Sequence, residues 1–364
     1  MAGHSDVRVG MSADTEEAPV LREPTSREPH SSTCLAEAST IDFGHNSAVR
    51  DNRGFFEALI GDGRPLIVLT ALCLIGSGGF ALFLSASGQF LPHDIQFLGM
   101  SAEELCALFE CRIVHFMFHD RVSFGGVLIA IGALYLWLTE FPLKERSAWA
   151  WWALFLSAVV GFLSFLTYIG YGYLDSWHGT ATLFLLPCFI SGMILTRRSL
   201  EGDRSVRSIL KRGEPVEWRT PFGIGILLLL LTGMGMMGAG FTIMTVGMTS
   251  VFVPQDLEYM ATTAEALRAL NSRLIPLIAH DRAGFGGGLF STGVAWFLCV
   301  WCSSFRRSLW QVLALAGAVG FATAIGIHPL VGYLSVPHLA PAILGALMFL
   351  VGIVLTFRAW KRES

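Results

Sequence analysis

Eight long apolar stretches, separated by polar segments, follow one another along the chain after residue 60. An α-helix needs about 20 predominantly apolar residues to cross the roughly 30 Å hydrocarbon layer of a bilayer. The stretches lack the strict alternation of polar and apolar residues found in barrel strands, so the pattern predicts helices. The predicted transmembrane helices span residues 65–86, 124–141, 148–171, 177–196, 222–246, 285–301, 309–327 and 340–357.

The amino-acid composition supports a membrane location. Of the 364 residues, 53% are hydrophobic and 15% are charged, whereas about a quarter of the residues in soluble domains are charged. The lipid bilayer is therefore the expected solvent and partner, and a nucleic-acid partner is not indicated. The expected fold class is an all-α integral membrane protein with about eight transmembrane helices.

The first 60 residues contain no comparable apolar stretch. They mix Ser, Glu, Asp, Arg, Pro and His, and such a segment buries too little apolar surface to offset the entropy lost on ordering. They also lack the basic segment followed by an apolar segment that marks a cleavable signal peptide. We expect residues 1–60 to form a disordered cytoplasmic tail.

Arginine and lysine concentrate in alternate connections between the predicted helices. The positive-inside rule places these connections, and both chain ends, in the cytoplasm. The other four connections, at 87–123, 172–176, 247–284 and 328–339, then face outward. A bacterial inner membrane is the default location. The basic residues are Lys144, Arg146, Arg197, Arg198, Arg204, Arg207, Lys211, Arg212, Arg219, Arg306, Arg307, Arg358, Lys361 and Arg362.

Short motifs recur in the two halves of the chain at nearly constant spacing. Phe-Leu-Pro-His-Asp ends at Asp94 and Phe-Val-Pro-Gln-Asp ends at Asp256, which is 162 residues later. The segment His-Asp-Arg-x-x-Phe-Gly-Gly begins at residue 119 and again at residue 280, with an offset of 161. A Tyr-Leu-x-x-x-His segment ends at residue 178 and again at residue 338, with an offset of 160. This regularity indicates an internal duplication.

The duplication predicts the domain organisation. Each half contains an even number of predicted helices, so both halves enter the membrane from the same side, and a pseudo-two-fold axis is expected along the membrane normal. Residues 61–200 and 222–364 are the predicted parallel four-helix repeats. Residues 201–221 form the predicted cytoplasmic linker.

The two long outer connections each contain a short helix signal. Ser101 with Glu104, and Thr262 with Glu265, have the spacing of a capping box, so a short interfacial helix is expected in each. Cys106 and Cys111 lie in the first of these connections, where an oxidising compartment would allow a disulfide. A separation of five residues is unfavourable for a disulfide if the segment is helical.

The best candidates for chemistry are the histidine, aspartate and arginine residues that the repeat duplicates. Imidazole and carboxylate groups bind zinc and other divalent metals. The residues all stand at predicted outer helix ends, where they can line one vestibule. The candidate metal ligands are His119, His178, His280 and His338, and the candidate ligand-binding residues are Asp120, Arg121, Asp281 and Arg282.

Other interpretations of these motifs stay open. The aspartates can cap the following helices or pair with the arginines, and the sequence favours this structural role over metal binding, because adjacent histidine and aspartate side chains diverge on a helix. Haem is disfavoured as a cofactor because the histidines stand near helix ends. His328 has no histidine counterpart in the repeat. We expect it to hydrogen-bond within its loop, although with His338 it can add asymmetry to a site.

The function that this layout favours is binding of a small ligand or metal in a polar outer vestibule between the two halves. The residue pattern does not indicate whether an enzymatic reaction takes place there. One alternative is a secondary transporter, whose two halves rock about a central site and whose Asp-Arg motifs form an outer gate. Another alternative is a non-catalytic subunit of a larger membrane complex.

Overall fold

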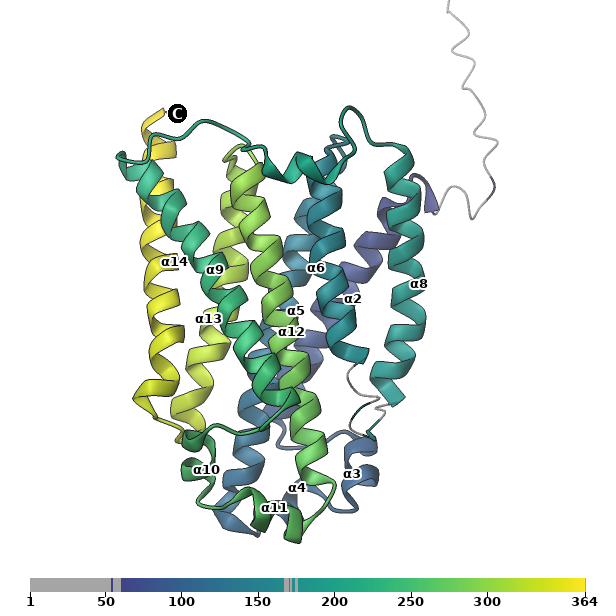
Figure 1. Ribbon diagram of the computed structural model, residues 1–364, viewed down its shortest axis with the longest axis vertical. Coiled ribbons are helices and arrows are strands. Elements are labelled where there is room, and N and C mark those ends of the chain that lie inside the picture. Colours follow the sequence, from purple (N-terminus) through teal and green to yellow (C-terminus); the bar gives the residue numbers. More distant parts are fainter. Residues whose placement is uncertain (1–53, 55–59, 167–169, 171, 174–175, 364) are drawn as a thin grey trace, which may run out of the picture. The chain divides into compact units, whose positions relative to one another are not determined.

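A computed structural model describes the membrane-associated part of the chain, shown in Figure 1. Most of the described residues are helical, and none of them forms a strand. Of the tail predicted for residues 1–60, only residues 54 and 60 belong to the described set. The described backbone covers residues 54, 60–166, 170, 172–173 and 176–363, and the side chains of 165, 166, 176–178 and 358–363 lie outside the description.

Eight long helices dominate the described residues. They are α2 (Arg64–Ala86), α5 (Arg112–Glu140), α6 (Ala148–Leu166), α8 (Ser176–Arg198), α9 (Pro221–Met248), α12 (Leu274–Cys302), α13 (Arg307–Val331) and α14 (Val336–Glu363). Seven of these described helices are long and apolar enough to cross a membrane, and α6 is a shorter apolar helix. Their lengths and composition indicate an integral membrane protein, as the hydrophobic pattern predicts.

The outer surface of the helix bundle is apolar. Phe83 on α2, Leu183 on α8 and Leu344 on α14 are each more than half exposed. Large exposed apolar patches are rare on soluble monomers. Contact with lipid tails accounts for these side chains, since no water has to be ordered around them in a bilayer.

Two helices begin well before the predicted spans. Helix α5 begins at Arg112 instead of residue 124, and α12 begins at Leu274 instead of residue 285. The additional turns contain the charged His-Asp-Arg motifs. These motifs lower the local hydropathy, so the hydropathy pattern assigns them to the connections between helices. Because the charges pair inside the bundle, the helices continue through them.

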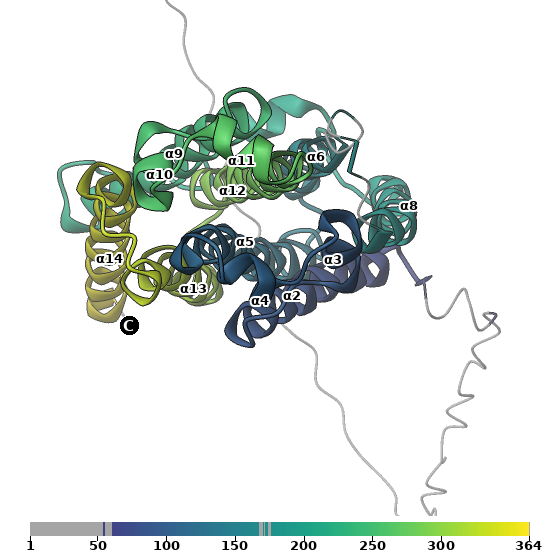
Figure 2. The same cartoon turned by 90° about the horizontal axis from the view of Figure 1, so that it is seen from below.

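The long helices form two rows, as Figure 2 shows along the bundle. One row contains α9, α12 and α6, the other contains α13, α5 and α2, and α12 contacts α5 between the rows. Helix α14 packs on α9 and α13, while α8 packs on α2 and α6. The apolar segments of α5 and α12 are 78% and 67% buried, against 22–39% for the other five candidate spans. Helices α5 and α12 therefore form the centre of the bundle.

The third long helix of each half packs mainly on the other half. Helix α6 lies along α12, and α13 lies along α5, whereas α6 contacts α5 only slightly. Small residues permit these contacts: a Cβ added to Gly126 would collide with Thr323 of α13, and one added to Gly287 would collide with Ser164 of α6. Small residues at helix contacts allow close backbone approach in membrane proteins. The two halves are thus interleaved.

Four short helices cover one end of the bundle, which we call the histidine end. The opposite end, where Arg146, Arg197 and Arg306 lie, is called the arginine end. The short helices are α3 (Pro92–Leu98), α4 (Ala102–Cys106), α10 (Pro254–Met260) and α11 (Ala264–Leu270), and two 3₁₀ turns occur at Phe109–Cys111 and Val206–Leu210.

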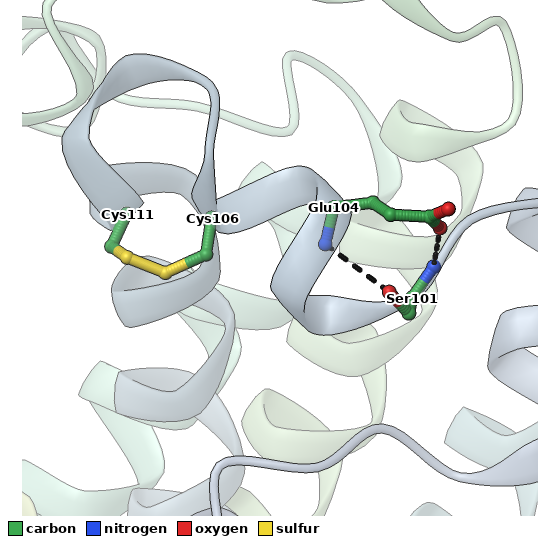
Figure 3. The surroundings of a disulfide bond; sticks show 4 residues. All are labelled: Ser101, Glu104, Cys106 and Cys111. Carbon is green, nitrogen blue, oxygen red and sulfur yellow. Dashed lines mark hydrogen bonds between the residues drawn. A yellow bond between two sulfur atoms is a disulfide. The ribbon is translucent and has the colours of Figure 1, made fainter.

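The predicted capping boxes are correct in the first half only. In Figure 3, the Glu104 backbone N–H donates to Ser101 Oγ (3.1 Å), and the Ser101 N–H donates to the Glu104 carboxylate (2.7 Å). In the second half, Thr263 and not Thr262 is the cap, and its hydroxyl accepts from the N–H of Ala266 (3.2 Å). The shift by one residue removes the reciprocal acidic contact, because Ala266 occupies the position of Glu104.

Cys106 and Cys111 form a disulfide beside this capping box (Figure 3). The objection that five residues is an unfavourable separation applies only to a continuous helix. Here Phe109, Glu110 and Cys111 have positive φ angles of 52°, 53° and 62°. The resulting turn brings the two cysteine Cα atoms to 3.9 Å.

Candidate functional site

Both His-Asp-Arg motifs lie about two turns inside a long helix at the histidine end. His119, Asp120, His280 and Arg282 are each no more than 5% exposed. Neither aspartate stands at a helix start, so the proposed capping role is not observed. The early start of α5 and α12 instead carries these polar side chains into the interior of the bundle.

Arg282 is held by acceptors from both halves. Its Nε donates to Asp120 Oδ2 (3.1 Å), and its Nη1 donates to Asp256 Oδ2 (2.6 Å) and to the Val251 carbonyl (2.7 Å). The Tyr333 hydroxyl donates to the other oxygen of Asp256 (2.7 Å). The guanidinium is therefore fixed by two carboxylates and a backbone carbonyl.

Arg121 occupies the matching position in the first half. Its Nε donates to Asp281 Oδ2 (2.9 Å), and its Nη1 lies 2.8 Å from Asp94 Oδ2. The Tyr173 hydroxyl donates to Asp94 Oδ1 (2.6 Å). This network repeats the contacts of Arg282, with an aspartate from each half around each arginine.

The crossed ion pairs connect the central helices. Arg121 of α5 pairs with Asp281 of α12, and Arg282 of α12 pairs with Asp120 of α5. The sequence pattern singled out these four residues for ligand binding or for pairing within each motif, whereas the ion pairs observed join one motif to the other. Removing one member of such a buried pair costs about 3–5 kcal/mol, because the other charge is left without its partner. The networks therefore stabilise the contact between α5 and α12.

Three histidines converge beside the Arg282 network. His119 Nε2 lies 3.0 Å from His328 Nε2, and ligand nitrogens of His119, His328 and His338 all lie within 4.8 Å of one another. The rings of His119 and His338 are 5.4 Å apart between centroids. Helices α5, α13 and α14 each contribute one of these imidazoles. The site thus forms only when the two halves are assembled.

Asp120 sets the orientation of the His119 ring. His119 Nδ1 lies 3.1 Å from Asp120 Oδ1, on the side of the ring opposite His328. When the Asp120 carboxylate is ionised, it accepts a hydrogen bond from Nδ1–H of His119, and this tautomer leaves the Nε2 lone pair directed at His328. Carboxylates commonly fix metal-binding histidines in this way. Although neighbouring side chains diverge along a helix, these two residues contact each other by turning their end groups together.

Tyr333 connects the three histidines to Arg282 through Asp256. Its ring stacks on His338 at 4.6 Å between centroids, and its hydroxyl lies 3.4 Å from His338 Nδ1. Burial, together with the nearby Asp256 carboxylate, raises the pKa of the Tyr333 hydroxyl far above its usual value. The hydroxyl therefore stays protonated and can donate to Asp256.

The corresponding histidine of the second half has different surroundings. His280 Nδ1 lies 2.9 Å from Asp281 Oδ1, and its ring meets Tyr173 edge-on at 4.9 Å between centroids. His178 lies in the first turn of α8, but its side chain lies outside the described residues. Of the four candidate metal ligands, the structure therefore brings His119 and His338 together, while His280 is not a member of the three-histidine cluster.

Sequence reasoning did not assign several residues to this site. Asp94 and Asp256 served only as repeat markers, as did Tyr173 and Tyr333, although their recurrence was a signal that they share a role. His328 was assigned to loop hydrogen bonding because it has no histidine counterpart. The available signal was its position ten residues before His338. A turn at Gly332, with a φ of 76°, lies between these two histidines.

Comparisons with family models, curated proteins and solved structures find no match to this chain.

Proposed function

We propose that this integral membrane protein binds a divalent transition metal through His119, His328 and His338 at the histidine end of the bundle. The observation that carries the proposal is the convergence of three imidazoles, from three helices, with ligand nitrogens no more than 4.8 Å apart. A buried group of imidazoles without a metal would have to remain uncharged or repel one another. Asp120 already orients one ring for coordination.

The geometry and ligand type suit zinc or a similar ion. In a tetrahedral zinc site with Zn–N distances of about 2.0–2.1 Å, neighbouring nitrogens are roughly 3.3 Å apart. The 3.0 Å distance between His119 and His328 is close to that value, and a rotation of the His338 ring would complete the set. Three protein ligands leave a fourth position for water or a small ligand, which is typical of catalytic zinc sites.

The proposed function includes a position in the membrane. The histidine end is proposed to face the extracytoplasmic side of a bacterial inner membrane, with both termini in the cytoplasm. The arginine end follows the positive-inside rule, and a disulfide at the histidine end suits an oxidising compartment. A bound ion would then be exchanged from the periplasmic side.

The two halves are proposed to be parallel repeats, at residues 61–200 and 222–364, joined by the linker 201–221. The order of long and short helices from α2 to α8 is the order from α9 to α14. The interleaved third helices and the crossed ion pairs support a pseudo-two-fold axis along the membrane normal. The metal site lies away from this axis, because only one half contributes His328.

Metal analysis of the detergent-purified full-length protein tests the proposal. We expect about one equivalent of zinc or a similar ion after incubation and removal of the excess, and at least a 100-fold weaker affinity in His119→Ala and His328→Ala. Metal binding requires neutral imidazoles, so the affinity of the unmodified protein should also fall as the pH is lowered.

His280→Ala is the matched control, because His280 has the same aspartate contact but lies outside the cluster. It should keep the affinity of the unmodified protein. Loss of metal in His280→Ala would favour the four-histidine set suggested by the sequence over the set proposed here. A correctly folded unmodified protein that takes up no metal would refute both.

Metal binding is preferred over transport because of the packing between the halves. Helices α5 and α12 contact each other directly, and Gly288 of α12 lies against Phe124 and Val127 of α5. A rocking transporter would need to open this contact around a central site. The transporter and the subunit role therefore have less support from the described residues than a fixed metal site.

A further inference from the structure

The bundle contains a cavity that the metal site does not use. It lies between α2, α5, α6, α8, the start of α3 and the first turns of α12, and it has a volume of about 220 Å³. Most of its wall is apolar. One end is polar, and Asp94, Arg121, His280 and Asp281 form that end. The apolar wall includes Leu74, Phe80, Leu84, Phe124, Phe162 and Leu185.

The cavity reaches the outer surface of the bundle between α2 and α8. These helices touch near the arginine end, where a Cβ on Gly192 would lie 2.8 Å from Ile67 Cγ1. Nearer the histidine end, Phe80 of α2 lines the cavity and is 52% exposed. The corresponding helices α9 and α14 have a more extensive contact. A molecule dissolved in the bilayer can therefore enter the cavity from the side, between α2 and α8.

The polar end favours a neutral hydrogen-bond acceptor. Asp94, Arg121 and Asp281 together carry a net charge of −1, so a further anion is disfavoured. The ion pairs use Nε and Nη1 of Arg121, whereas a guanidinium has five N–H donors. Donors of Arg121 thus remain for a carbonyl oxygen of a bound molecule.

The size of the cavity favours a single ring. A cavity of about 150 Å³ is sufficient to hold benzene. A volume of about 220 Å³ therefore suits one substituted six-membered ring, while a bulkier lipid headgroup would need the helices to separate. A hydrocarbon tail attached to the ring could leave between α2 and α8.

We propose that this cavity binds the ring of a lipid-soluble quinone, with a ring carbonyl at Arg121 and the hydrocarbon tail between α2 and α8. The ligand class follows from the combination of a neutral acceptor, a ring-sized space and an entrance from the bilayer. The site is separate from the three histidines and does not depend on metal binding. The proposal concerns binding only.

Equilibrium binding of a tritiated decyl-benzoquinone to the full-length protein in phosphatidylcholine nanodiscs tests the proposal. We expect saturable binding of about one molecule per chain. Thr182→Phe places a large side chain in the cavity from α8 and should weaken binding at least tenfold. Ala81→Phe does the same from α2, so two opposite walls are tested independently.

Ala342→Phe is the matched control. Ala342 lies on α14 at an offset of 160 from Thr182 and has the same intermediate exposure, and it does not line the cavity. Its affinity for the quinone should stay within twofold of the unmodified protein. Thermal unfolding of each variant identifies loss of binding that comes from misfolding.

Three outcomes would overturn the proposal. The first is the absence of saturable quinone binding by the unmodified protein. The second is unchanged affinity in folded Thr182→Phe and Ala81→Phe proteins. The third is displacement of the quinone by an equimolar amount of dioleoylglycerol, which would identify the occupant as a neutral glycerolipid.

Discussion

His119 and His280, the histidines of the two His-Asp-Arg motifs, make equivalent contacts with aspartate but have different neighbours on their other sides. His119 meets two further imidazoles, from α13 and α14. His280 meets the Tyr173 ring and borders the apolar cavity. Each histidine is nevertheless held by the following aspartate, and each aspartate is paired with the arginine of the opposite motif.

The shared contacts and the differing contacts have separate physical roles. The Asp-Arg-Asp networks connect α5 to α12 and are present on both sides, as expected for groups that maintain the fold. The additional imidazole of His328 is present on one side only, since the position 160 residues earlier is Tyr168, which lies outside the described residues. The three-histidine cluster therefore surrounds His119 and the apolar cavity borders His280, and each feature includes residues of both halves.

The largest expected difference concerns the two arginines. Arg282→Leu should lower the free energy of unfolding by about 3–5 kcal/mol, because it leaves Asp120 and Asp256 buried without their cation. Arg121→Leu should cost less, about 1–3 kcal/mol, because Arg121 and its partner Asp281 are each 12% exposed, against 6% for Arg282 and 4% for Asp120. Unfolding of the purified proteins in a denaturing-detergent titration measures both.

The double variant Asp120→Leu with Arg282→Leu serves as a control for this comparison. It removes both charges of one pair and should recover part of the stability lost in Arg282→Leu. Equal losses of stability in Arg121→Leu and Arg282→Leu would contradict the assigned difference in burial between the two arginines.

A smaller effect is expected from the aspartates that orient the histidines. Asp120→Asn keeps the size of the side chain but removes the charge that holds the Nδ1 proton of His119. Metal affinity should fall about 10–100-fold, as is usual when such an orienting partner is lost. Competition with a chromophoric chelator at constant pH provides the measurement.

Asp281→Asn is the corresponding change on the cavity side. It should leave metal affinity within about threefold, since His280 lies outside the cluster. A comparable loss in both variants would mean that the aspartates act through the general stability of the α5–α12 contact, and the orienting role of Asp120 would have to be abandoned.

Helix capping provides the smallest difference between the halves. Ser101→Ala removes a cap that has a reciprocal glutamate contact and should destabilise α4 by about 1 kcal/mol. Thr263→Ala removes the cap bond of α11, which lacks the reciprocal contact from an acidic side chain to the cap N–H, and should cost less. Amide hydrogen exchange in the two short helices compares them. Faster exchange in α11 than in α4 after these changes would contradict the comparison.

The sequence predicted the helical membrane class because length and hydropathy depend on local composition alone. It did not predict where α5 and α12 begin, since charges that pair within the bundle have the hydropathy of a loop. Arg121 and Asp281 are 160 positions apart, and hydropathy contains no information about contacts at that distance. The constant offsets of the repeat were the only indication that these groups are neighbours.

The candidate metal ligands show the same limit. Repetition selected His119 and His338, which lie in one cluster with His328, but it gave low weight to His328 because that residue has no counterpart in the other half. Helix α13 packs on α5 and α6 packs on α12, and this interleaving of the two halves determines which histidines meet. The interleaving depends on small residues such as Gly126 and Gly287, each in contact with a helix far away in the sequence. Such contacts cannot be inferred from a single sequence.

The interleaving of the third helices has a consequence for biosynthesis. When the ribosome has released α2 to α8, the buried face of α5 still lacks α13, and α6 still lacks α12. Until α12 and α13 are translated, the inserted first half exposes small residues such as Gly126 to lipid. Insertion factors that shield such faces, or rapid translation of the remaining chain, would then determine how much of the newly made protein matures.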